Sequence, residues 1–213
     1  MKKLLFLLLM ACVTVPSIAQ KDNNAKSILD RTYAAFKDAG GIKAKFSVRS
    51  YKGGKTLGAS KGSIQLKGTK FLLKTNESTI WFDGKTQWNY VYKNQEVNVS
   101  NPTTAELQNI NPYYILSIYQ RGFNYKMGPE SNFGGKSANQ IILSAQSSKN
   151  SILNIVIYVS TANDEPLSIS ITRKDGTKND LKISGYQVNQ NFSDAMFTFD
   201  KKKYSKVEVV DLR

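Results

Sequence analysis

The sequence of 213 residues is long enough for one domain with its own hydrophobic core. It has no histidine and one cysteine, which excludes a serine–histidine–aspartate triad and metal sites built from histidine or several cysteines. The 30 basic and 16 acidic residues give a net charge of +14, which favours either an acidic partner or anionic membrane, or a plainly solvated basic surface.

The first segment has the features of a secretory signal peptide. A basic start at Lys2 and Lys3 is followed by an apolar run over residues 4–13. Small residues at Ser17 and Ala19 occupy the positions that signal peptidase reads, so we expect cleavage after Ala19. The apolar run is too short for a good transmembrane helix, although a retained anchor is an alternative.

We therefore predict a signal peptide at 1–19 and one domain at 20–213 that folds in the periplasm. A second alternative is a lipobox that ends at Cys12, which would make this cysteine a lipidated N-terminus. If cleavage follows Ala19, the domain has no cysteine, so disulfides and thiol chemistry are excluded. The secretory signal and the lack of a recognisable nucleic-acid module predict no binding to nucleic acid.

Residues 22–39 are predicted to form an amphipathic helix. Asp22 or Asn23 can cap its start, and Gly40-Gly41 ends it. Apolar residues recur at helical spacing, so we expect one stripe to face the core. The stripe consists of Ala25, Ile28, Leu29, Tyr33 and Phe36.

After Gly41 the apolar residues alternate with a period of two, which indicates β-strands. Turn signals such as Gly53-Gly54 and Asp83-Gly84 separate the strands, and tight turns join antiparallel neighbours. The first predicted series covers about 44–48, 57–67, 71–74, 78–82, 88–92 and 96–99.

Residues 100–122 interrupt this rhythm with two asparagine–proline pairs. Short helices are predicted for Thr103–Leu107 and from Pro112 to about Tyr119. A sheet of about eleven strands curls or splits, and a curled sheet with helices against its inner face leaves an interior that a ligand can share. Strands resume at about 123–127, 138–144, 151–159, 166–173 and 177–188, with a last strand at about 207–212.

No catalytic constellation emerges from the residues. Asp164-Glu165 lies at a turn, where adjacent carboxylates are poorly spaced for a dyad. We therefore predict a protein that is not an enzyme and needs no cofactor. The basic run Lys201–Lys203 is either a solvated loop or a docking site for an acidic partner surface or for anionic lipid.

Residues 77–90 resemble the signature of the periplasmic outer-membrane lipoprotein carrier family of the LolA type. In that family a strand ends in Asp-Gly-Lys-Thr, here residues 83–86, and the next strand opens with x-Trp-x-Tyr, here residues 87–90. Weaker matches follow in the family's order, so the resemblance spans nearly the whole mature chain. They lie at 62–71, 111–116, 196–199 and 207–213.

The resemblance implies an α+β fold, an incomplete antiparallel β-barrel of about eleven strands with helices covering the concave apolar face as a lid. It implies a periplasmic chaperone that binds the acyl chains of lipoproteins and shuttles them from the inner to the outer membrane. The implied partners are an inner-membrane lipoprotein-releasing ABC transporter and an outer-membrane acceptor or membrane surface. We expect a monomer without cofactor or metal.

Two other functions compete with the carrier. A lipid- or lipoprotein-sensing protein of the same fold would act on a membrane regulator, although a single domain weakens that hypothesis. A secreted hydrolase that uses carboxylates is disfavoured by the missing histidine and by the lack of paired carboxylates.

Seven residues are predicted to line the acyl-chain cavity. Trp88 and Tyr90 match the family motif, and the other five rest on strand alternation. The seven are Phe46, Val48, Phe71, Leu73, Trp81, Trp88 and Tyr90.

The chain departs from the family at the expected lid latch. Prototype members have an arginine shortly before the phenylalanine that matches Phe71, and it holds the lid through loop carbonyls. Here residues 67–70 read Lys-Gly-Thr-Lys. Lys67 or Lys70 would have to substitute, without the planar fork of an arginine.

Overall fold

The computed structural model describes residues 22–107 and 111–213. The predicted signal peptide, its cleavage site and Cys12 lie outside the described residues. Among the helices of the described part, none combines the length and the apolar character needed to cross a membrane.

The first half of the sheet follows helix α1 (Asn23–Asp38). Strands that follow one another in the sequence pair as antiparallel neighbours, because tight turns join them. They are β1 (Gly41–Lys52), β2 (Lys55–Lys67), β3 (Lys70–Thr75), β4 (Ser78–Phe82), β5 (Gln87–Val91) and β6 (Glu96–Ser100).

Short helices separate this half from the second one, as predicted. They are α2 (Thr104–Leu107), α3 (Pro112–Ser117) and the 3-10 turn η1 (Ile118–Gln120). The second series of strands is β7 (Phe123–Met127), β8 (Asn132–Phe133), β9 (Lys136–Ala145), β10 (Ile152–Ser160), β11 (Pro166–Arg173) and β12 (Thr177–Gln187). Two 3-10 turns, η2 (Asp194–Phe197) and η3 (Lys201–Tyr204), and strand β13 (Glu208–Asp211) end the chain.

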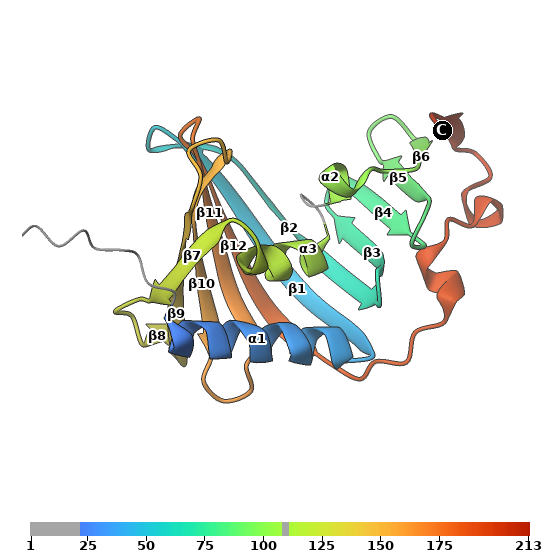
Figure 1. The fold of residues 1–213 in the computed structure, drawn as a ribbon. Helices are drawn as coiled ribbons and strands as arrows, with labels where there is room; N and C mark the ends of the chain where they lie inside the picture. Colours follow the sequence, from blue (N-terminus) through green and yellow to red (C-terminus); the bar gives the residue numbers. More distant parts are fainter. Residues whose placement is uncertain (1–21, 108–110) are drawn as a thin grey trace, which may run out of the picture.

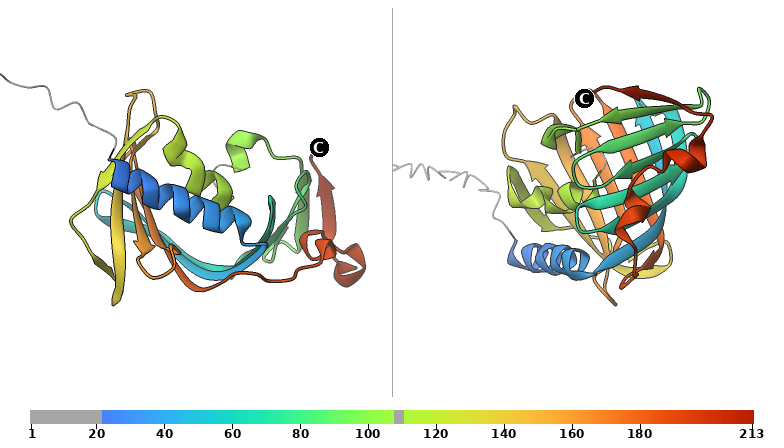
Figure 2. Two further views of the ribbon diagram at one scale, coloured as in Figure 1. Left: turned by 60° about the horizontal axis from the view of Figure 1, so that its bottom comes forward. Right: turned by 90° about the vertical axis from the view of Figure 1, so that its right-hand side faces the viewer.

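The strands form one curved, open sheet in the order β13-β6-β5-β4-β3-β2-β1-β12-β11-β10-β9-β7, with β8 beside β9. The pairing of β12 with β1 joins the two halves. Figure 2 shows the sheet as a trough that holds α1 and α3 on its concave side. The predicted half-barrel with helices on its concave face is therefore confirmed.

The sheet has 13 strands where about eleven were expected. One addition is the two-residue strand β8, which is too short to leave a periodic signal. The last strand, β13, also differs from the expected antiparallel pattern because it runs parallel to β6. A parallel neighbour cannot be reached through a tight turn, and residues 188–207, which lead from β12 to β13, run along the convex side of the sheet (Figure 2).

Asp22 caps α1 and fastens it to the sheet. One of its carboxylate oxygens accepts hydrogen bonds from the backbone N–H groups of Asn24 (2.8 Å) and Ala25 (3.2 Å). The other accepts from the N–H of Met127 on β7 (3.0 Å). The apolar stripe of α1 then lies on the concave face, where Ala25, Ile28, Leu29 and Phe36 are buried.

The sheet carries apolar layers on both faces. The large core lies on the concave face, beneath α1, α3 and η1. A second, aromatic cluster lies on the convex face of β3–β5, where residues 188–207, called here the C-terminal segment, cover it. This cluster contains Leu72, Trp81, Trp88, Tyr90, Phe192, Met196, Phe197, Phe199 and Tyr204.

Two lysines fasten the C-terminal segment to the turn between β2 and β3. Lys67 donates from Nζ to the carbonyl oxygen of Phe192 (2.8 Å) and to Oδ1 of Asp194 (2.9 Å). Lys70 donates to Oδ2 of the same carboxylate (2.8 Å). These hydrogen bonds lower the pKa of Asp194 to about 2.

Acid is expected to loosen the C-terminal segment. The folded pKa of Asp194, about 2, lies below the ordinary value of 3.8, so its contribution to stability is present above pH 4 and lost as the pH falls towards 2. Tryptophan fluorescence should report this transition, because Trp81 packs against Phe199 of the segment. Asp194→Asn should abolish the transition, whereas Asp38→Asn, which removes an exposed carboxylate of α1, should retain it. An unchanged acid transition in Asp194→Asn would contradict this account.

Candidate functional site

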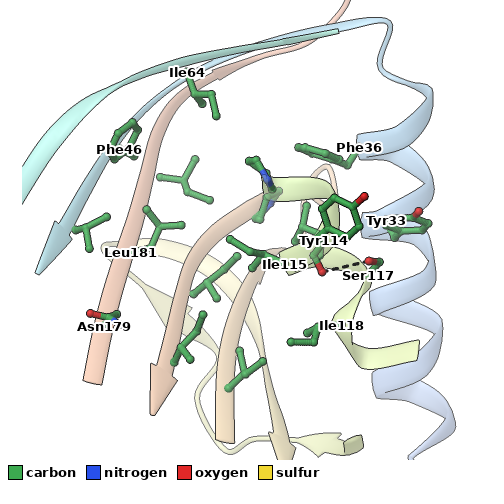
Figure 3. A pocket seen from close by; sticks show the side chains of 18 of the residues that line it. Tyr33, Phe36, Phe46, Ile64, Tyr114, Ile115, Ser117, Ile118, Asn179 and Leu181 are labelled. Carbon is green, nitrogen blue, oxygen red and sulfur yellow. Dashed lines mark hydrogen bonds between the residues drawn. The ribbon is translucent and has the colours of Figure 1, made fainter. Parts of the chain in front are cut away.

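An open cavity of about 1080 Å³ lies between the concave face of the sheet and the helices α1 and α3 (Figure 3). This volume is at the upper end of the range for small-molecule sites in proteins. Most of the lining is apolar and comes from β1–β3, β10–β12, α1, α3 and η1. The main apolar residues are Tyr33, Phe36, Ile42, Ala44, Phe46, Val48, Ile64, Leu66, Leu73, Tyr114, Ile115, Leu116, Ile118, Ile152, Ile155, Ile169, Ile171, Leu181 and Ile183.

Strand alternation and register build the wall of this cavity. Residues directly opposite one another on paired strands point to the same face. Ala44, Ile64 and Leu73 are opposite one another across β1, β2 and β3. Val48 on β1 is likewise opposite Leu181 on β12, and Leu181 is opposite Ile169 on β11. Apolar rows therefore cross the concave face from strand to strand.

Gly62 makes room for the ring of Phe46. The two residues are opposite each other on β2 and β1. A Cβ atom at position 62 would lie 2.8 Å from Cζ of Phe46 and 2.0 Å from the carbonyl oxygen of Lys74. Only glycine allows this close approach of ring and backbone, so Phe46 covers the strand and presents its half-buried side chain to the cavity.

The helical side of the cavity is tied to α1. Tyr114, Ile115 and Ile118 face the strands across the cavity (Figure 3). Behind them, the hydroxyl of Tyr119 donates a hydrogen bond to Oδ1 of Asp30 on α1 (2.7 Å). Burial is the main cause that raises the pKa of Tyr119 to about 12, so the phenol stays protonated and keeps this bond at neutral pH.

One end of the cavity is polar. Arg121, Asn150, Ser151, Arg173 and Asn179 line it there, next to the hairpin turns between β9 and β10 and between β11 and β12. The cavity thus combines a long apolar interior with a polar, cationic rim. This combination suits an amphiphile better than a wholly apolar or wholly charged molecule.

Among the described residues, no group of three or more aspartate, glutamate, cysteine or histidine side chains is placed to hold a metal ion. The mostly apolar lining can bury the apolar part of a ligand.

Comparison with known proteins agrees with this geometry. The family model described as "Outer membrane lipoprotein carrier protein LolA" matches residues 15–177. The chain belongs to this LolA family. No curated protein matches the sequence.

Two solved structures support the same fold for this LolA-family protein. An uncharacterized conserved protein from Thermus thermophilus has a TM-score of 0.58 at 14% identity, covering 88% of this chain and 99% of that one. The lipoprotein LppX of Mycobacterium tuberculosis has a TM-score of 0.51 at 13% identity, covering 81% of this chain and all (100%) of its own. At these identities the likeness concerns the fold alone.

The structure brings three of the seven predicted wall residues to the cavity. Phe46, Val48 and Leu73 line it. Phe71 faces the same concave core but is fully buried against Phe82, with ring centroids 5.2 Å apart, and lies outside the cavity lining.

The structure places the other three, Trp81, Trp88 and Tyr90, on the convex face. The register gives the reason, because Phe71 is opposite Phe82, which fixes Phe82 on the concave side and its neighbour Trp81 on the other. Trp88 is opposite Trp81, and Tyr90 follows it on the same face. The three pack in the aromatic cluster beneath the C-terminal segment.

Several lining residues escaped the sequence prediction. Leu181 and Ile183 alternate with polar residues along β12, so the period-two pattern could have identified them. The contribution of α3, including Tyr114 and Ile115, left no such signal because its six residues are too few for a helical periodicity.

Lys67 and Lys70 donate their hydrogen bonds to the C-terminal segment on the convex side, rather than to the helices on the concave side. The turn after β2 does contact the helical side, but donor and acceptor are exchanged relative to the family latch. Asn111, which is buried just before α3, donates from Nδ2 to the carbonyl oxygen of Thr69 (3.4 Å). The donor therefore sits on the helical side and the acceptor on the turn.

Proposed function

We propose that this LolA-family protein is a periplasmic carrier that binds the acyl chains of lipoproteins in its cavity and carries them from the inner to the outer membrane. The observation that carries the proposal is the open apolar cavity of about 1080 Å³ on the concave face. The family match supports lipoprotein as the cargo. In this role the protein catalyses no reaction and needs no cofactor.

The energetics of lipid transfer explain why such a cavity is needed. Moving an acyl chain into water costs about 0.8 kcal/mol per methylene. Two or three chains of about fifteen methylenes would cost roughly 25–35 kcal/mol, so a lipoprotein does not cross an aqueous compartment unescorted. A cavity lined by many aliphatic and aromatic side chains replaces the lost lipid contacts without specific hydrogen bonds, so binding should depend little on the protein part of the cargo.

Transport needs a donor and an acceptor. In the proposed cycle the carrier is loaded by an inner-membrane lipoprotein-releasing ABC transporter, works as a monomer, and unloads at an outer-membrane acceptor or at the membrane itself. The alternative is a sensor of the same fold that binds lipid or lipoprotein and acts on a membrane regulator. Both functions use the same cavity, but the carrier hands its cargo on, whereas the sensor passes a signal to its regulator.

Two measurements test the proposal. The exported protein, stripped of lipid, should bind a synthetic triacylated lipopeptide and displace a fluorescent fatty-acid probe from the cavity, whereas the same peptide without acyl chains should not. Added to spheroplasts, the protein should release lipoproteins into the soluble fraction and pass them to outer-membrane vesicles. Lipopeptide binding without release would favour the sensor, and no lipopeptide binding would refute both.

A further inference from the structure

Three hairpin tips lie side by side at one end of the sheet, on the side away from α1 (Figure 1). The first joins β1 to β2 through Gly53-Gly54, and the others join β9 to β10 and β11 to β12. The register confirms their adjacency, because Lys52 is opposite Thr177, and Ile152 is opposite Arg173. The three turns with their flanking residues, 51–58, 146–153 and 173–178, together form the tip surface.

Two leucines are exposed on the tip surface. Leu57 is 61% exposed and Leu153 is 45% exposed. Each lies at a shift in register that leaves it without a partner across the ladder. Ser50 and Tyr51 are opposite Gly58 and Thr56, which skips Leu57, and Ile152 and Asn154 are opposite Arg173 and Thr172, which skips Leu153. Such bulges redirect a side chain, and here both present leucine to the surroundings.

The tip surface is also basic. The carboxylates on and beside it are Asp175 and Asp180, and Asp180 is paired with Lys178 at 3.0 Å. Exposed lysines outnumber them. These are Lys52, Lys55, Lys149, Lys174 and Lys178.

The polar end of the cavity opens beside these tips. Ser151 and Arg173 belong both to the tip surface and to the cavity lining. A partner that binds the tip surface would thus lie next to the cavity rim through which an acyl chain enters or leaves.

We propose that the tip surface docks on an anionic phospholipid membrane, with Leu57 and Leu153 inserted between the head groups and the lysines facing the lipid phosphates. Exposed apolar side chains within a basic patch are the combination that binds membrane interfaces, and each basic residue near such a surface strengthens binding by roughly fivefold. Docking in this orientation brings the cavity rim to the lipid. A role of this membrane docking in cargo transfer rests on the proposed function, whereas the docking itself does not.

Vesicle flotation tests the proposal. The exported, lipid-free protein is mixed with vesicles of phosphatidylcholine alone or of phosphatidylcholine with phosphatidylglycerol. We expect binding to the anionic vesicles that weakens with salt. Leu57→Gln with Leu153→Gln, and separately Lys52→Gln, Lys55→Gln and Lys174→Gln together, should each weaken it by about tenfold or more.

Matched controls use residues far from the tips. Leu212→Gln removes a leucine that is 64% exposed near the C-terminus, and Lys201→Gln, Lys202→Gln and Lys203→Gln together remove the same charge as the lysine variant. Both controls should bind like the unchanged protein. The proposal would be overturned if the unchanged protein did not bind anionic vesicles. It would also be overturned if the tip variants and the control variants lost vesicle binding equally, because net charge alone would then attract the protein.

Lipopeptide binding in solution separates this proposal from the proposed function. The tip variants should bind the triacylated lipopeptide as the unchanged protein does, because the altered side chains lie outside the apolar lining. If the unchanged protein binds vesicles through its tips but no lipopeptide, docking stands and the carrier function fails.

Discussion

Phe46→Glu is expected to remove most acyl-chain binding while the fold survives. The side chain is half-buried, faces the cavity and covers Gly62, so the new carboxylate would lie where an acyl chain is expected to pack. Loss of the apolar contact costs about 1.5–3 kcal/mol, and the carboxylate adds the cost of bringing a charge beside hydrocarbon. The dissociation constant for a triacylated lipopeptide should rise by at least about tenfold.

Ser47→Glu is the matched control for this prediction. It introduces the same residue one position along β1, on the exposed convex face. Circular dichroism and the unfolding midpoint should show that both variants fold, and lipopeptide binding should separate them. If Phe46→Glu binds as tightly as Ser47→Glu, Phe46 is not part of the binding wall.

Trp81→Ala should destabilise the protein strongly without acting on the cavity. Trp81 is only 6% exposed, and its ring lies 5.5 Å from that of Phe199 and 5.6 Å from that of Tyr204. Truncating a buried tryptophan lowers the free energy of unfolding by about 3–5 kcal/mol. Urea unfolding followed by circular dichroism measures this loss.

Trp81→Phe keeps an aromatic ring in the same place and should lose much less stability. Below the unfolding transition, both variants should bind lipopeptide like the unchanged protein, since Trp81 lies on the convex face. A folded Trp81→Ala protein that no longer binds lipopeptide would instead connect the convex cluster to the cavity.

Much of the fold could be predicted from local patterns. The stripe of α1, the glycine turns and the alternation along β1 and β2 each specify an element within a few neighbouring residues, and the structure confirms these elements. Local patterns predict the last strand but not the strand with which β13 pairs, because its parallel partner β6 lies far earlier in the chain. The predicted boundaries at 1–19 and 20–213 stay predictions, as does cleavage after Ala19.

The candidate site was only partly predictable for a related reason. Alternation shows that Trp88 and Tyr90 share a face, but not which face looks inward. A strand with one apolar face ordinarily turns it to the main core, and here the C-terminal segment offers that face a second apolar layer instead. On the concave side of β5 lie Gln87 and Asn89, opposite Phe82 and Ile80, so the polar face of this strand looks inward.

The C-terminal segment also has a consequence for the order in which the protein is made. Strands β3–β5 emerge early in synthesis, whereas the residues that cover their aromatic face, such as Phe197 and Tyr204, come almost last. Until then the tryptophans stay open to water and to other chains, a situation that favours aggregation. A chain interrupted before residue 190 would leave this face bare, and chaperones and proteases that bind exposed aromatic surface would thereby distinguish unfinished molecules from complete ones.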